Sequence, residues 1–199
     1  MSPLPRRALL LALIALPMAA RAEAGPTAPV QALLDGLAAN AKAGKATPFA
    51  ARAAKLGAVV DSTFDLPAIL LAAVGPRFNS FAPDAQAALL TAFRDFTVAS
   101  WVANFDTDEG QRFELNAQTR AVGADQVVST AIVPKDGDPT RLDYVMRNTN
   151  GSWKAVDILV DGAISRVAIQ RSDFRTLLKD GTPGPLIDML KGKAADLAR

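Results

Sequence analysis

The chain of 199 residues contains no histidine and no cysteine, and its 22 basic residues nearly balance 20 acidic ones. This composition excludes Ser/His/Asp and Cys/His catalytic systems, imidazole and thiolate metal sites, and disulfides. Folding must therefore depend on packing alone.

The first 24 residues predict a secretory signal peptide. Arg6 and Arg7 precede an apolar run, and two overlapping A-x-A cleavage sites follow it. The run is shorter than the roughly 20 residues of a membrane span, which disfavours an uncleaved anchor. Cleavage would remove three arginines and one glutamate, so the formal net charge would fall from +2 to zero. We therefore expect an exported domain over residues 25–199 that does not bind nucleic acid.

The helical part, residues 27–105, has apolar residues at helical spacing. Thr27 and Thr47 are the expected N-caps of the first two helices, with Pro48 as the first residue of the second helix. Four helices are predicted, over residues 27–44, 48–61, 66–74 and 83–104. The fourth carries an apolar stripe wide enough to cover a sheet or to form the wall of a cavity: Leu89, Leu90, Phe93, Phe96, Thr97, Trp101 and Phe105.

From residue 111 the apolar period changes from about 3.6 to 2, and the sheet is expected over residues 111–160. Four strands are predicted, over residues 112–122, 125–133, 141–149 and 153–160, with turn-forming residues between them. Two helices over residues 164–197 close the chain, with Ser165 and Thr182 as caps. The order predicts an α+β fold, in which an antiparallel meander of four or slightly more strands packs with N-terminal and C-terminal helices.

Few side chains offer chemistry beyond apolar packing. The acidic turn over residues 106–110 departs from a calcium loop in its glycine position and lacks the closing glutamate, so we expect no metal. No phosphate-binding or dinucleotide motif is present, and no cofactor is expected. An isomerase-like enzyme could use Asp65 or Asp157 with Tyr144. We favour structural roles, with Asp65 as a helix cap and Asp157 on a polar strand face, and we expect no catalytic residue.

The apolar stripes leave two interpretations open. The aromatic residues concentrate between Phe64 and Phe113, and the strands carry apolar residues at alternate positions. Periodicity cannot distinguish a packed core from a cavity that holds a ligand.

Several short stretches, in this order, carry a family resemblance: Phe64-Asp65; Gly75 with Phe78; Phe93 with residues 101–105 (WVANF); residues 153–157 (WKAVD); and residues 162–165 (GAIS) with Arg171 and Phe174. Together they resemble the MlaC family, over the whole chain after the signal peptide. Two positions depart from the usual pattern, since Phe78 replaces a tryptophan and Ile169-Gln170 replaces an Asn-Tyr pair. Both changes could alter the shape of a pocket.

The resemblance implies a periplasmic, non-enzymatic carrier of glycerophospholipid, in a family also known as toluene-tolerance proteins. Its implied partners are a membrane-anchored MlaD-like protein of an inner-membrane ABC transporter and an outer-membrane lipoprotein complex, and a monomer is expected. A hopanoid or another apolar lipid is the alternative cargo. Arg166, Arg171 and Arg175 could contact a head group or a partner, or simply be solvated.

The resemblance also implies an apolar pocket for acyl chains. We expect the Phe93 and Trp101 face of the long helix to oppose the Leu142, Tyr144 and Met146 face of the third strand, with lipid tails between them. The predicted lipid-binding residues are Phe64, Leu70, Val74, Phe78, Leu90, Phe93, Thr97, Trp101, Phe113, Leu115, Leu142, Tyr144, Met146, Ile164 and Val167.

Overall fold

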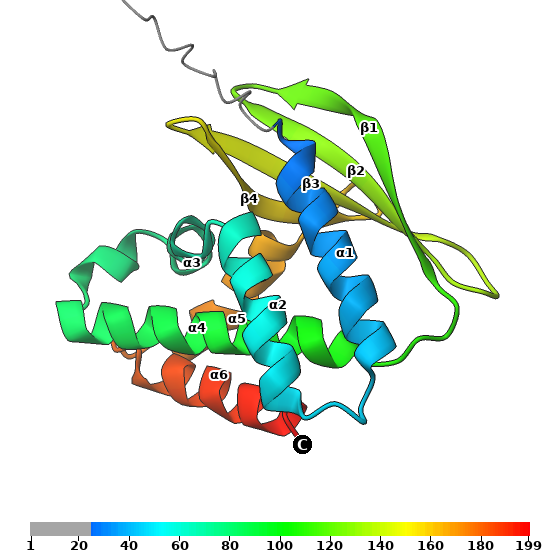
Figure 1. The fold of residues 1–199 in the computed structure, drawn as a ribbon. Helices are drawn as coiled ribbons and strands as arrows, with labels where there is room; N and C mark the ends of the chain where they lie inside the picture. Colours follow the sequence, from blue (N-terminus) through cyan, green and yellow to red (C-terminus); the bar gives the residue numbers. More distant parts are fainter. Residues whose placement is uncertain (1–24) are drawn as a thin grey trace, which may run out of the picture.

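The structure, a computed structural model, describes residues 25–199, so the predicted signal peptide lies outside the described residues. These residues form six α-helices, one short 3-10 helix and a five-stranded sheet. The helices gather on one side of the sheet, and the long helix α4 (Pro83–Asn104) runs across the helical layer (Figure 1). The predicted α+β architecture is confirmed.

The N-terminal helices are α1 (Thr27–Ala43), α2 (Phe49–Thr63) and α3 (Leu66–Val74), followed by the 3-10 helix η1 (Pro76–Ser80). Asp65 caps α3 as predicted, because its carboxylate accepts a hydrogen bond from the Ala68 amide at 3.0 Å. The predicted caps Thr27 and Thr47 are wrong. Prolines occupy the N-cap positions of α1 and α2, neither of which has a side-chain cap, and the Thr47 hydroxyl instead donates to the Ala43 carbonyl at 3.0 Å.

The sheet is an antiparallel meander of β1 (Arg112–Val122), β2 (Asp125–Val133), β3 (Thr140–Thr149), β4 (Ser152–Val160) and β5 (Ile164–Ser165), paired in chain order. Asn150 and Gly151 connect β3 to β4 with φ angles of 53° and 82°. Positive φ at both central residues is the signature of the tight turn whose twist matches a hairpin. Asp161 and Gly162 repeat this pattern before β5, with φ angles of 51° and 74°.

The last two helices are α5 (Arg166–Leu177) and α6 (Gly184–Leu197). The prediction that the first of them begins at Ile164 is wrong, because Ile164 and Ser165 pair with the end of β4 as a fifth strand. Ser165 still caps α5, since its hydroxyl accepts a hydrogen bond from the Ala168 amide at 3.0 Å. Thr182 is not a cap, because Pro183 occupies the N-cap position of α6.

One backbone connection joins the helical layer to β4, the fourth of the five strands. Phe64, between α2 and α3, forms a parallel bridge to Ala155 of β4, and the Asp65 amide donates to the Ala155 carbonyl at 2.9 Å. Both Phe64 and Ala155 are buried. The α2–α3 junction is therefore fixed on the sheet, and its aromatic ring lies under α4.

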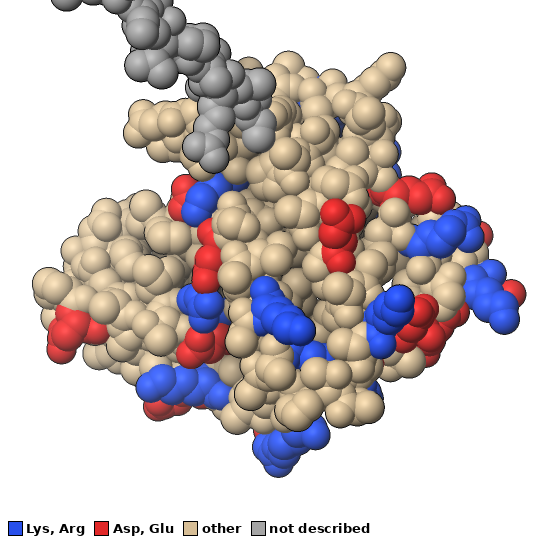
Figure 2. Space-filling view, in the orientation of Figure 1, with Lys and Arg blue, Asp and Glu red and all other residues tan. Residues whose placement is uncertain are grey.

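The surface carries no large patch of one charge on the face shown in Figure 2, where basic and acidic side chains are interspersed. None of the helices between residues 25 and 199 combines the length and the apolar character that crossing a bilayer requires.

Candidate functional site

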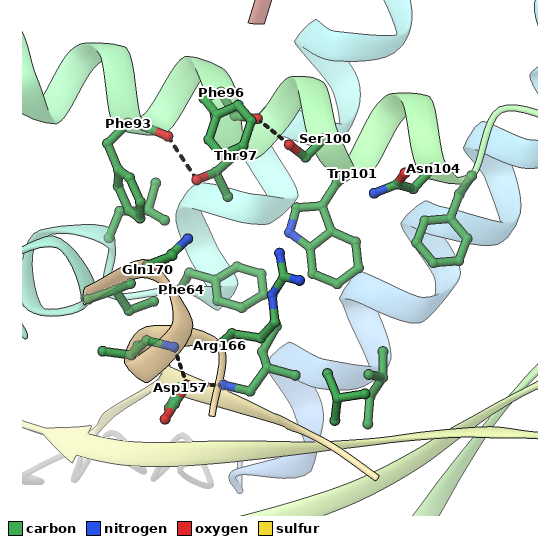
Figure 3. Close-up of a pocket in the computed structure, with 17 residues that line it drawn as sticks. Phe64, Phe93, Phe96, Thr97, Ser100, Trp101, Asn104, Asp157, Arg166 and Gln170 are labelled. Carbon is green, nitrogen blue, oxygen red and sulfur yellow. Dashed lines mark hydrogen bonds between the residues drawn. The ribbon is translucent and has the colours of Figure 1, made fainter. Parts of the chain in front are cut away.

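A partly open pocket of about 330 Å³ lies between α4, the α3 and α5 helices and the sheet (Figure 3). Its volume falls in the lower part of the range of about 300–1,000 Å³ that is usual for small-molecule sites. Most of the residues that line it are apolar. The complete lining consists of Phe64, Leu66, Ile69, Phe93, Phe96, Thr97, Ser100, Trp101, Asn104, Phe105, Leu142, Asp157, Ile158, Val160, Arg166, Val167 and Gln170.

Helix α4 forms the longest wall. Its lining residues recur every three or four positions, so they share one face of the helix. The two hydroxyls on this face are satisfied within the helix, since Thr97 donates to the Phe93 carbonyl and Ser100 to the Phe96 carbonyl, both at 2.8 Å. The wall therefore presents mostly methyl groups and aromatic rings to the pocket, and the Asn104 carboxamide and the Trp101 indole are its other polar groups.

A chain of aromatic rings crosses the floor of the pocket. The Trp101 ring stacks on Phe64 at a centroid distance of 5.9 Å and on Phe105 at 5.8 Å. On its other side, Phe64 contacts the Tyr144 ring of β3 at 6.3 Å. Phe64 therefore lies between the pocket and Tyr144, which is 0% exposed.

Three polar side chains of the pocket lie where β4 meets α5. The Asp157 carboxylate accepts hydrogen bonds from the Ser165 hydroxyl at 2.5 Å and the Val167 amide at 3.1 Å, so it satisfies the N-terminus of α5. Arg166 and Gln170, one turn apart on α5, complete this side (Figure 3).

A second hollow, of about 510 Å³, shares Asn104 and Phe105 with the pocket. It is larger but more polar, and the loops after α4 and β2 form most of its wall. Because an apolar lining is typical of organic-ligand sites, the aromatic pocket is the better candidate.

Residues 29–192 match the sequence profile of the MlaC protein family, which is most of the chain. The chain belongs to the MlaC family. A comparison with curated proteins found no match. Among solved structures, the chain is similar to a phospholipid-binding protein from Ralstonia solanacearum in complex with a phospholipid, at a TM-score of 0.70 and 22% identity. The alignment covers 88% of this chain and 100% of that one, and at this identity the likeness shows the fold.

MlaC proteins are non-enzymatic lipid carriers, and membership in the family confirms the expectation that this chain is not an enzyme. The geometry agrees, because Asp65 and Asp157 both cap helices. The Tyr144 hydroxyl is buried and has no hydrogen-bond partner within residues 25–199, and this burial raises the pKa of Tyr144 above its ordinary value. In the same residues, no group of three or more acidic side chains is placed to hold a metal ion.

Six of the fifteen residues predicted for this MlaC pocket line it: Phe64, Phe93, Thr97, Trp101, Leu142 and Val167. The structure places the other nine elsewhere. Leu70, Tyr144 and Met146 are 0% exposed within the packed core, and Val74, Phe78, Leu90, Phe113 and Leu115 pack against that core outside the pocket. Ile164 is 53% exposed because it belongs to the edge strand β5 rather than to a helix that covers the sheet.

The predicted opposition of α4 and β3 across the pocket therefore holds at Leu142, whereas Tyr144 and Met146 are not in the lining. Three missed residues of α4, Phe96, Ser100 and Asn104, follow Phe93 at the helical spacing, so the periodicity already contained the signal. Phe105 belongs to the same apolar stripe, one turn after Trp101. The other missed residues of the lining depend on contacts between distant segments, which the sequence pattern does not reveal: Leu66, Ile69, Asp157, Ile158, Val160, Arg166 and Gln170.

Proposed function

We propose that this protein carries a glycerophospholipid, with acyl-chain atoms in the aromatic pocket beside α4. The main support for the proposal is the apolar, aromatic character of that wall, in a chain that belongs to the MlaC family. The rings of Phe64, Trp101 and Phe105 form a continuous apolar surface, and the hydroxyls beside them are already bonded within α4. Such a surface favours an apolar ligand over a polar one. The solved relative in complex with a phospholipid adds support.

The energetics of an exposed acyl chain explain why a carrier is useful. A chain of sixteen carbons contains about 14 methylenes, and each contributes about 0.8 kcal/mol when it is removed from water. Exposing one chain therefore costs about 11 kcal/mol, which makes unassisted transfer through water very slow. A pocket that provides similar apolar contacts reduces this cost, and because it is partly open, the lipid can leave again.

The carrier is proposed to work as a single-domain monomer in the periplasm. The predicted signal peptide motivates this location. We propose that it moves lipid between an outer-membrane lipoprotein complex and a membrane-anchored MlaD-like protein of an inner-membrane ABC transporter. Release then requires a second conformation that the membrane-bound partner stabilises.

Mass spectrometry of lipid extracted from the natively purified protein tests the proposal. We expect a stoichiometric diacyl glycerophospholipid. A hopanoid in its place would replace the proposed cargo with the alternative one. Protein that is consistently empty and also takes no lipid from phospholipid vesicles would contradict the carrier function.

A further inference from the structure

The three arginines of α5 have different environments. The Arg171 guanidinium donates two hydrogen bonds to the Ala72 carbonyl of α3, at 2.9 and 2.6 Å, so it joins two helices. Arg175 is exposed in the last turn of α5 and does not line the pocket. Arg166 is exposed yet lines the pocket, which places it at the opening, and its side chain extends from the start of α5 toward the α4 wall (Figure 3).

Arg166 forms no ion pair with Asp157, the acid that lines the same side of the pocket. Asp157 lines the same side of the pocket, but its two carboxylate oxygens accept hydrogen bonds from Ser165, Val167 and the Ile158 amide. Across residues 25–199, no carboxylate forms an ion pair with Arg166. An arginine is charged at every physiological pH, so the opening of a largely apolar pocket carries a guanidinium that is not held in an ion pair.

A second polar group with free capacity lies one turn along α5. The Gln170 Oε1 atom is buried and accepts no hydrogen bond from any residue that the structure describes. Gln170 lines the pocket with Arg166, and residues four apart lie on the same face of a helix. A buried acceptor without a donor is unfavourable, and a ligand that donates a hydrogen bond there would relieve it.

We propose that Arg166 binds the phosphate of the lipid head group and thereby makes the pocket select phospholipids over neutral lipids with the same acyl chains. The guanidinium fork matches two phosphate oxygens, whereas the rest of the opening offers an anion no cation of comparable reach. Gln170 Oε1 then accepts a hydrogen bond from a hydroxyl or ammonium group of the head group. This inference rests on the proposed lipid-carrier function and assigns recognition of the lipid head group to the α5 side of the pocket.

The test compares two lipids that differ only in the phosphate-containing head group. Lipid-free protein is incubated with dodecyl maltoside micelles that contain either dioleoyl phosphatidylglycerol or dioleoylglycerol, and bound lipid is measured by native mass spectrometry. We expect wild-type protein to prefer phosphatidylglycerol. Arg166→Gln should weaken phosphatidylglycerol binding by about threefold to tenfold, as expected for a partly solvated charged contact, and leave dioleoylglycerol binding unchanged.

Two control variants separate the site from general charge. Arg175→Gln removes the same charge from the same helix outside the pocket, and both lipids should bind as in wild type. Arg166→Lys keeps the charge without the planar fork, and we expect an intermediate loss. Because Arg166 is exposed, all three variants should fold, which melting curves check.

Three results would overturn the inference. Phosphatidylglycerol binding that is the same in Arg166→Gln and wild type would exclude a head-group contact, and an equal loss of both lipids would mean that Arg166 only shapes the pocket. Inorganic phosphate alone that binds wild type as tightly as phosphatidylglycerol would assign Arg166 to a free anion. If wild type bound neither lipid, the proposed function itself would fail.

Discussion

One face of β3 passes through two different environments. Its apolar residues Leu142, Tyr144 and Met146 alternate along the strand, but Tyr144 and Met146 are 0% exposed in packed core, whereas Leu142 lines the pocket. The difference comes from Phe64, whose ring lies between Tyr144 and Trp101. Leu142 borders the open space of the pocket. The pocket therefore continues the hydrophobic core along β3, beyond the part of the strand that Phe64 covers.

The largest loss of stability is expected from a charge at Met146, where the face of β3 is buried in packed core. Met146→Glu places a carboxylate among core side chains without a partner, and this should cost more than about 4 kcal/mol, enough to prevent folding. Circular dichroism and a melting curve check the outcome. This differs from the sequence-based expectation, in which Met146 faces lipid tails. A folded, cooperatively melting Met146→Glu protein would show that this end is hollow as well.

Removing the Phe64 ring, which separates the packed core from the pocket, should cause the next largest loss of stability. Phe64→Ala leaves a cavity between Tyr144 and Trp101, and we expect the free energy of unfolding to fall by about 3–5 kcal/mol. Phe105→Ala is the matched control, since Phe105 also stacks on Trp101 but is only partly buried, and its loss should be smaller. Equal losses in urea unfolding would contradict the separating role of Phe64.

A charge at Leu142, where the face of β3 lines the pocket, should affect lipid binding more than folding. Leu142→Glu can be reached by water through the open pocket, so we expect a loss of only about 1–2 kcal/mol in stability. Bound lipid should disappear, because an unpaired carboxylate facing acyl chains is unfavourable. Melting curves and lipid extraction are measured on the same sample. A folded variant with its full complement of lipid would remove this strand face from the site.

The smallest effect concerns the hydroxyl of Tyr144. Its oxygen is buried without a partner among the described residues, so Tyr144→Phe should leave stability unchanged or raise it by about 1 kcal/mol. Burial raises the pKa of Tyr144, whereas tyrosine in the unfolded chain ionises near its ordinary pKa of about 10. Above that pH the unfolded state binds fewer protons, so stability falls as the pH rises, by up to about 1.4 kcal/mol per pH unit.

The Tyr144→Phe variant has no phenol to ionise, so its stability should fall less than that of wild type as the pH rises above about 10. Tyr144 is the only tyrosine in the chain, so the near-ultraviolet absorbance of phenolate reports it alone. Ionisation of Tyr144 near its ordinary pKa, in protein that is still folded, would contradict its burial beneath Phe64.

The elements of the fold follow from local sequence patterns. The bounds predicted for α3, α4, β1 and β2 agree with the structure, because each has a sustained apolar period and a turn residue or proline at its limits. The two-residue strand β5 is too short to have a period, so the sequence pattern predicts that the following helix begins at Ile164. The caps predicted at Thr27, Thr47 and Thr182 are wrong because a neighbouring proline takes the N-cap position in each case.

The pocket was predictable only where one helix forms it. The spacing along α4 identifies a single face, and that face is the wall. Which part of β3 remains open depends on the bridge from Phe64 to Ala155, two residues more than ninety positions apart in the sequence. Arg166 and Gln170 enter the lining because β5 turns the chain before α5 begins. These placements are set by tertiary contacts, which residue spacing does not reveal.

In the proposed carrier an acyl chain lies against the α4 wall, and fluorescence quenching by a brominated lipid tests this placement directly. The chain has two tryptophans: Trp101 lines the pocket, and Trp153 on β4 does not. A phosphatidylglycerol with a dibrominated acyl chain should strongly quench Trp101 in the Trp153→Phe variant and leave Trp153 in the Trp101→Phe variant nearly unchanged. Bound brominated lipid that leaves Trp101 unquenched would place the acyl chain outside this pocket and contradict the proposed lipid site.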